Sequence, residues 1–227
     1  MKRLCILFLS LTLTIFPVTG GGYPLQSPAR QVLSEVRTYN WTSAKGWFRG
    51  QITKIYRESY DKEGRLILRE FFYKDMIPAE ITEYTYKENM VKKTTRNSEN
   101  VVIRNVLVQN EDDKRTETVL RGDGTLFYKT VSVLRNNGEV MELSYYNGQE
   151  QLVYNKVFEY TRTGDVKKIS MYNPDNSLAI AIDIVYEEFD DMGNWVSRSE
   201  YYTYGDVRKR PRDSVHREIQ YGGDADE

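Results

Sequence analysis

Few residues of this chain have the type and spacing needed for acid–base or metal chemistry. His216 is the only histidine, and no G-x-S-x-G nucleophile motif accompanies it, so a Ser-His-Asp site has no local support. Gly-rich phosphate loops and dinucleotide fingerprints are absent from the sequence. The adjacent acid pairs lack the spacing of a calcium-binding loop: Asp112-Asp113, Glu187-Glu188 and Asp190-Asp191. We therefore predict no catalytic residue, no metal site and no cofactor, and we expect a protein that is not an enzyme.

A secreted carbohydrate-active enzyme is the alternative hypothesis. A retaining glycosidase needs two carboxyl groups about 5 Å apart. The 33 acidic residues could supply such a pair at many places, and this abundance singles out none of them.

Aromatic residues give better support to a binding function. The chain has 18 tyrosines, 8 phenylalanines and 3 tryptophans, and tyrosines on neighbouring strands can form ladders. Such a ladder suits sugar rings or a partner strand when it is exposed, and it forms the core of a thin sheet when it is buried. Trp195, Tyr201, Tyr202 and Tyr204 form a cluster near the C-terminus. Trp195 and Tyr202 are an odd number of residues apart, so a regular strand would point their rings to opposite faces.

A short repeated pattern indicates how the chain positions these residues. The pattern is an aromatic or apolar residue, three residues, Gly, one residue and an apolar residue. It predicts a type I turn whose Gly takes a positive φ in a G1 bulge. In one copy Asn176 replaces Gly, and Asn tolerates this conformation well. The copies are Tyr60/Gly64/Leu66, Leu120/Gly124/Leu126, Leu134/Gly138/Val140, Tyr160/Gly164/Val166, Tyr172/Asn176/Leu178 and Phe189/Gly193/Trp195.

The segments between these turns read as short strands and predict an all-β fold. We expect an antiparallel meander of about 13 strands built from the hairpin repeats, forming an elongated sheet with a thin core. The last two strands would form a hairpin at the end of this sheet, with a free edge or an exposed ring face for a partner. The expected strands are 51–59, 65–73, 77–86, 90–95, 101–109, 114–120, 125–134, 139–146, 151–160, 165–172, 177–188, 194–204 and 215–221.

The domain boundaries follow from the same reading. Residues 1–20 are expected to be a signal peptide, 21–45 an N-terminal arm, 46–221 a single β-repeat domain and 222–227 an acidic tail. The arm permits a short helix starting near Ser27, although it also alternates as a strand does.

The string YDKEGRLI at 60–67 resembles the core of the YD, or RHS-type, repeat of bacterial secreted and cell-surface proteins. FDDMGNW at 189–195 and YTRTGDV at 160–166 resemble degenerate copies of it. The resemblance implies an antiparallel β architecture and an extracellular or envelope location. In some members of that family it also implies carbohydrate contact or encapsulation of another polypeptide.

The N-terminus predicts export. Lys2 and Arg3 precede an apolar run at 4–16, and Val18-Thr19-Gly20 suits a signal peptidase. The run is shorter than the roughly 20 residues that span a bilayer, so we expect cleavage, with an uncleaved anchor as the alternative. Cys5 is the only cysteine, so the mature chain would have no disulfide. Export without disulfides favours a bacterial protein of the periplasm, the cell surface or the medium.

Charge excludes some partners and favours others. The formal net charge is −1 with both signs interspersed, so nucleic-acid binding has no basic surface to support it. The basic run at 208–212 reads as a solvated loop. A transmembrane barrel needs an outward apolar band, whereas charges such as Lys54, Glu58, Lys129 and Glu142 occur in most strands. We therefore expect no transmembrane segment after signal cleavage, and a binding or scaffold module for a glycan or a protein.

Overall fold

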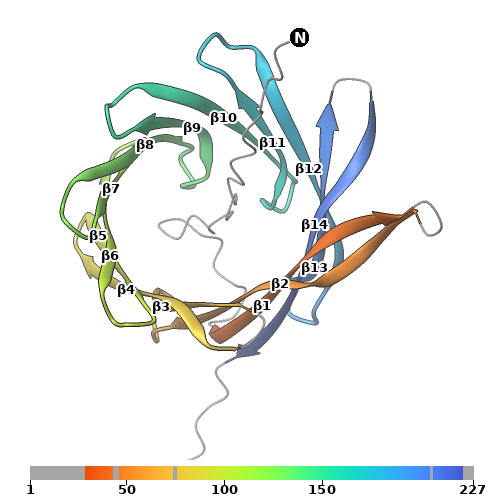
Figure 1. Ribbon diagram of the computed structural model, residues 1–227, viewed down its shortest axis with the longest axis horizontal. Helices are drawn as coiled ribbons and strands as arrows, with labels where there is room; N and C mark the ends of the chain where they lie inside the picture. The colour runs from red at the N-terminus through yellow and green to blue at the C-terminus, as the bar shows by residue number, and fades with distance from the viewer. Residues whose placement is uncertain (1–28, 43–45, 74–75, 205–206, 222–227) are drawn as a thin grey trace, which may run out of the picture.

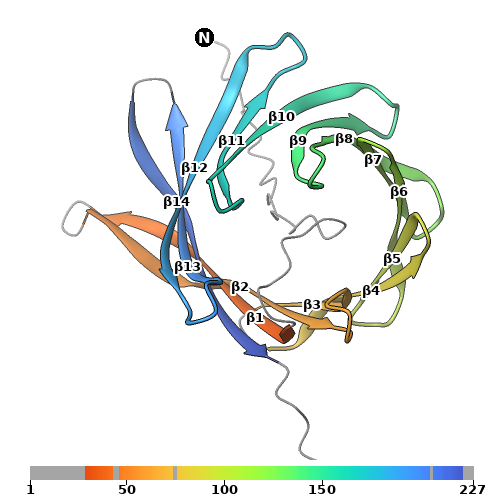
Figure 2. The same ribbon diagram turned by 180° about the vertical axis from the view of Figure 1, so that it is seen from behind.

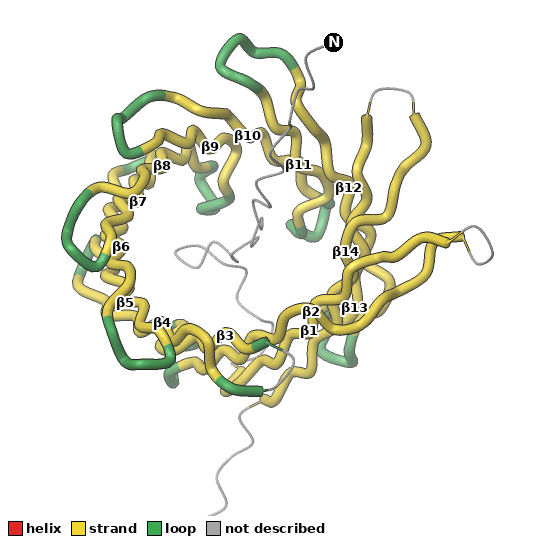
Figure 3. The backbone as a smooth tube through the Cα atoms, viewed as in Figure 1, coloured by secondary structure: helices red, strands yellow, loops and turns green. Residues whose placement is uncertain are grey.

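The computed structural model describes residues 29–42, 46–73, 76–204 and 207–221, which form fourteen β-strands (Figure 1). These residues contain no helix, and loops join one strand to the next (Figure 3). Accordingly, no helix in the described part of the chain has the length and hydrophobicity to cross a bilayer. The strands are β1 (Ala29–Thr42), β2 (Gly46–Tyr60), β3 (Leu66–Phe72), β4 (Pro78–Lys87), β5 (Met90–Asn97), β6 (Val102–Glu111), β7 (Lys114–Arg121), β8 (Leu126–Leu134), β9 (Val140–Asn147), β10 (Leu152–Tyr160), β11 (Val166–Tyr172), β12 (Leu178–Phe189), β13 (Trp195–Tyr204) and β14 (Val207–Tyr221).

Each strand pairs antiparallel with the next, and β14 pairs with β1, so the sheet closes into a barrel. The closing register runs from Val32 opposite Ile219 to Thr38 opposite Asp213. The view from behind shows the same closed ring (Figure 2). The expected open, elongated sheet of about 13 strands is therefore wrong, although the chain is all-β and its strands are antiparallel.

The short N-terminal helix is also wrong, because Ala29–Thr42 forms strand β1. Val32, Leu33 and Val36 fit a helical stripe, whereas Val32, Ser34 and Val36 fit a strand face. The strand is formed because β1 pairs with β2 on one side and β14 on the other. The expected signal peptide and acidic tail lie outside the described residues.

The predicted turns are confirmed. The five repeat glycines and Asn176 all have positive φ, from 63° at Asn176 to 92° at Gly164. In the first copy the Gly64 amide donates to the Asp61 carbonyl at 3.0 Å, and the Asp61 amide donates to the Arg65 carbonyl at 2.9 Å. The same two bonds recur in the loops that start at Asn97, Arg121, Arg135, Asn147, Thr161, Asn173 and Asp190.

Besides the Asn176 loop, two of these loops have no glycine at the left-handed position, and the sequence pattern missed them. Asn100 and Glu150 take that position with φ of 62° and 59°. In both loops the side-chain oxygen of the first residue accepts two backbone amides, and Asn147 Oδ1 accepts from Gln149 and Gln151, both at 3.0 Å. The same cap occurs in the Gly64 loop, where Asp61 is the acceptor. This side-chain cap therefore stabilises the turn whether or not a glycine takes the left-handed position.

The two faces of the barrel differ in burial. In β5, Val91 and Thr95 are buried, whereas Met90 and Lys92 on the opposite face are exposed. The same difference continues through β6, β7 and β8, where buried and partly buried residues share one face. Side chains converge on the concave face of a closed barrel and spread apart on its convex face, so we assign the more buried face to the interior.

The hydrophobic core lies on this interior face as two separate clusters. The first contains Val91, Val106, Val108 and Val119 with three partly buried tyrosines packed against it. The second contains Ile169, Ile182 and Ile184, again with aromatic neighbours. Both clusters therefore belong to a layer that follows the wall of the barrel.

Three tyrosines tie consecutive hairpins together, and we call them the tyrosine clamps. The hydroxyl of Tyr86 donates to the Leu66 carbonyl at 2.8 Å. Tyr160 donates to the Val140 carbonyl at 2.8 Å, and Tyr186 donates to the Val166 carbonyl at 3.0 Å. Each acceptor is the first residue of a strand that follows a repeat turn, and each donor lies 20 residues further along the chain. The clamps thus satisfy backbone carbonyls that the strand ladder leaves free at the turn.

The turn geometry predicts opposite effects of two substitutions. Gly64→Val should destabilise the protein by about 1 to 3 kcal/mol, because a β-branched residue is strained at φ 74° even though its Cβ would meet no atom. Glu150→Gly should stabilise it by up to about 1 kcal/mol by relieving that conformation, and Asn176→Gly should be neutral or slightly stabilising. Urea denaturation of the three variants is the measurement, and equal midpoints for Gly64→Val and Asn176→Gly would show that the turn assignment is wrong.

Candidate functional site

The residues with potential for acid–base chemistry are dispersed in the structure. His216 is exposed in β14, opposite Ser197 on one side and Glu35 on the other. Asp112-Asp113 lie in the turn between β6 and β7, and Asp190-Asp191 lie in the turn between β12 and β13. In the described ranges, no group of three or more His, Cys, Asp or Glu side chains could hold a metal ion.

The C-terminal aromatic cluster is arranged differently from the prediction. Trp195 contacts Tyr186 with ring centroids 5.8 Å apart and lies beneath the Arg217 guanidinium, so its ring is on the interior face. Tyr202 is on the same face, where it packs against the isoleucine cluster. The two rings share a face because the register shifts between Ser197 and Trp195, which inserts a bulge into β13. The expectation of opposite faces is therefore wrong for Trp195 and Tyr202, and Tyr201 is the outward ring.

A row of three tyrosines crosses the interior face of β8, β9 and β10. Tyr128 and Tyr145 have ring centroids 5.0 Å apart, and Tyr145 and Tyr154 are stacked at 4.7 Å with an interplanar angle of 9°. Lys156 extends the row, because its Nζ lies 5.1 Å from the centroid of the Tyr154 ring. We call these four residues the tyrosine row.

The polar atoms of the tyrosine row are available to a ligand. The hydroxyls of Tyr128, Tyr145 and Tyr154 form no hydrogen bond with a described residue, and none of the three oxygens is fully enclosed. Burial raises the pKa of all three, so the hydroxyls stay protonated at neutral pH and can both donate and accept. The row therefore presents rings and unsatisfied hydroxyls side by side.

Lys156 has an unusual electrostatic environment. Burial, and secondarily the positive charge of Arg212, lower the pKa of Lys156 to about 8. Its neighbours directly across the strand pairs are Leu143 and Met171, which carry no charge. Among the described residues no carboxylate forms an ion pair with it, whereas Lys93 on the same face binds Glu117 at 3.1 Å. The ammonium therefore faces the interior with little compensation.

A second polar cluster on the interior face belongs to β13 and β14. Glu200 accepts from Arg198 at 3.1 Å and from Arg212 at 3.0 Å, and all three side chains are largely buried. Arg212 also contacts Asp213 at 3.2 Å and lies over the Tyr202 ring. Burial raises the pKa of Asp213 despite the nearby Arg212 and Lys54. The members of this cluster neutralise one another, so it supports the barrel wall.

On the outer face, Glu187 links distant strands. Its carboxylate accepts from Ser199 at 2.6 Å, from Ser197 at 3.1 Å and from Arg49 of β2. The hydroxyl of Tyr39, in β1, forms a hydrogen bond of 3.1 Å with the hydroxyl of Ser199. These bonds fasten the β1–β2 hairpin to β12 and β13. They also outweigh the effect of burial and lower the pKa of Glu187, so it stays ionised.

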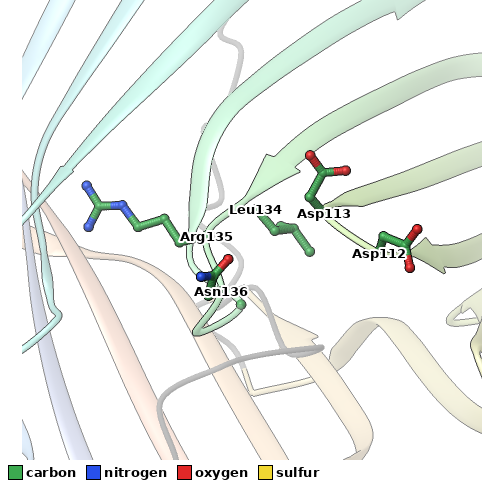
Figure 4. A pocket seen from close by; sticks show the side chains of 6 residues that line it. Asp112, Asp113, Leu134, Arg135 and Asn136 are labelled. Carbon is green, nitrogen blue, oxygen red and sulfur yellow. The ribbon is translucent and has the colours of Figure 1, made fainter.

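A surface pocket lies at the turns after β6 and β8 (Figure 4). Asp112, Asp113 and Asn136 are among its lining residues. Figure 4 shows the Arg135 side chain pointing away from both aspartates, and Arg135 instead pairs with Glu139 at 2.8 Å. The polar groups of this pocket do not converge, so the tyrosine row is the stronger candidate site.

Comparison with known proteins gives structural similarity only. No family model matches the chain, and no curated protein matches it. A porin-like protein from Bacteroides uniformis is similar over 86% of this chain and 97% of its own, with 10% identity and a TM-score of 0.48. A DUF1329 family protein from Desulfovibrio piger is similar over 92% of this chain and 95% of its own, with 13% identity and a TM-score of 0.31. A LolA superfamily protein from Nitrosomonas europaea covers 88% of each chain, with 9% identity and a TM-score of 0.29.

The expected relationship to YD or RHS-type repeat proteins is wrong. No family model matches the chain, and the hairpins close into one barrel instead of an open repeat sheet. The string YDKEGRLI forms the predicted turn, and the chemistry of that turn accounts for its residues.

The low pKa of Lys156 predicts a pH-dependent stability change. The pKa of about 8 in the folded chain lies below the ordinary value of 10.5, so the charged ammonium destabilises the fold below about pH 8. Lys156→Met should therefore increase the free energy of unfolding at pH 7 by on the order of 2 kcal/mol, because each pKa unit corresponds to about 1.4 kcal/mol and the ammonium keeps some solvent contact. The gain should shrink as the pH rises from about 8 to 10.5.

Chemical denaturation at a series of pH values measures this effect. Lys92→Met is the matched control, because Lys92 lies exposed on the outer face of β5 and should change stability little. A loss of stability in Lys156→Met at pH 7 would contradict the assignment of an uncompensated interior ammonium.

Proposed function

We propose that this protein is an exported, non-enzymatic barrel that binds a glycan on its interior face. The observation that carries the proposal is the tyrosine row, in which three adjacent tyrosines keep their hydroxyls free of described partners. Tyrosine rings provide apolar surface for the C–H faces of sugars, and their hydroxyls exchange hydrogen bonds with sugar hydroxyls.

Closure of the barrel favours a glycan over a protein strand. A partner strand adds to a sheet through a free edge, where backbone amides and carbonyls are unpaired. β14 was expected to lie at such an edge, but it pairs with β13 on one side and β1 on the other. A ligand that is recognised by side chains on one face remains compatible with this architecture.

The outer face favours an aqueous compartment. A barrel in a bilayer presents an apolar band outward on alternate residues of each strand. Here the outward positions of several strands carry charges: Glu83, Lys92, Lys129, Glu159 and Lys168. Together with the signal-like N-terminus, this supports a protein of the periplasm, the cell surface or the medium.

Substitutions on opposite faces of β9 test the proposal. Tyr145→Ala removes the central ring of the row, and it should weaken glycan binding about tenfold, since an aromatic contact contributes about 0.5 to 1.5 kcal/mol beyond burial. The matched control is Tyr146→Ala, which removes the same side chain from the outer face of the same strand. An array of neutral and acidic oligosaccharides identifies a ligand, and calorimetry then compares the variants. No glycan bound by the wild type, or equal loss from both variants, would exclude this site.

Export is tested separately by mass spectrometry of the native protein from an envelope fraction. We expect an N-terminus near Gly21, because residues 1–20 have the composition of a signal peptide. Recovery of the chain with Met1 attached would contradict cleavage.

A further inference from the structure

We propose that the ligand of the tyrosine row is an acidic glycan and that Lys156 pairs with its carboxylate. This inference rests on the proposed glycan-binding function and adds the chemical class of the ligand. It is carried by the position of the Lys156 ammonium, which lies over the Tyr154 ring, 5.1 Å from its centroid, at the end of a row of tyrosines whose hydroxyls have no described partner.

Most other cations of the interior face have protein acceptors, and Lys54, which forms no ion pair with a described residue, has the favourable charge of Asp213 near it. Arg69 is paired with Glu58, and both side chains are buried. Arg104 binds Glu80 at 3.2 Å, and Arg217 donates to the Trp195 carbonyl at 3.0 Å through Nε. Lys156 has only the ring face of Tyr154 among the described residues. A buried cation without a counter-ion is unfavourable, so pairing with an anionic ligand would stabilise the Lys156 ammonium.

The groups around Lys156 favour an anion. Tyr145 and Tyr154 are the titratable neighbours on β9 and β10, and both stay neutral because burial raises their pKa. Leu143 and Met171 face it across the adjacent strands and carry no charge. Arg212 adds positive potential and, after burial, contributes to lowering the pKa of Lys156. No acid is among the groups that shift this pKa.

The hydroxyls of the row favour a sugar acid over a fatty acid, although both carry a carboxylate. An alkyl chain would leave the three hydroxyls without hydrogen-bond partners, and unsatisfied polar groups weaken binding. A sugar chain that follows the row offers hydroxyls to each tyrosine and a carboxylate to Lys156. The recognised ligand is therefore a polyhydroxylated chain with at least one carboxylate.

Calorimetry with three probes tests the inference. The probes are a uronic-acid tetrasaccharide, the same tetrasaccharide with its carboxyl groups reduced to alcohols, and laurate. At pH 7 the wild type should bind the acidic tetrasaccharide at least tenfold more tightly than the reduced one, and laurate weakly or not at all. Lys156→Gln should bind both tetrasaccharides with the low affinity that the reduced one shows for the wild type.

The pH profile separates charge recognition from a structural role. Affinity of the wild type for the acidic tetrasaccharide should fall as the pH rises above about 8, because the free Lys156 loses its proton there. Lys156→Arg keeps its charge and should restore the preference for the acid while removing this decline. Thermal melts establish that each variant is folded.

The outcomes distinguish this inference from the proposed function. Equal affinity of the wild type for the acidic and reduced tetrasaccharides would overturn the inference and leave glycan binding intact. Preference for the acid that survives in Lys156→Gln would also overturn it. Tight binding of laurate with no binding of any glycan on the array would overturn both.

Discussion

The pairing of β1 with β14 is the constraint on which the rest of the structure depends. It joins the first strand to the last and leaves no free edge in the described sheet. Closure also makes the two faces unequal, since one is confined and the other is solvated. The buried polar groups of the confined face therefore need partners within the protein, whereas its accessible hydroxyls can bind water or a ligand.

The interior face shows how this constraint is met. Glu58 and Arg69 are both buried, and Tyr60 donates to Glu58 at 2.8 Å. Such pairs form because an isolated buried charge is costly, whereas a paired and hydrogen-bonded one is tolerated. Tyrosine suits the same face because its ring packs while its hydroxyl reaches a carbonyl or the open interior. A mean hydropathy of −0.63 is compatible with a stable barrel because much of its wall is built in this way.

The parts of the fold that the sequence predicts are local, and the parts that it does not predict depend on distant residues. Gly64 and Asn176 could be assigned to positive φ because turn chemistry acts within five residues. The strand from Ala29 was missed because its pairing with β14 joins residues about 190 positions apart, as Val32 and Ile219 illustrate. The placement of Trp195 failed because a bulge in β13 shifts the alternation by one residue. Tyr128, Tyr145 and Tyr154 meet only through the register of three strands, which composition cannot supply.

The tyrosine clamps give the barrel a modular wall. Each clamp joins a strand end to the carbonyl at the start of the preceding strand, and Tyr160 and Tyr186 repeat this arrangement 26 residues apart with the same chain distance to their acceptors. One hairpin therefore carries its own turn, its own clamp and a docking point for the next hairpin. Where neighbouring hairpins are joined by a clamp, the chain can change its circumference by gaining or losing a whole hairpin, because the clamp repeats the same contact. Barrel diameter, and with it the width of the interior, then becomes a property that gene duplication can alter in discrete steps.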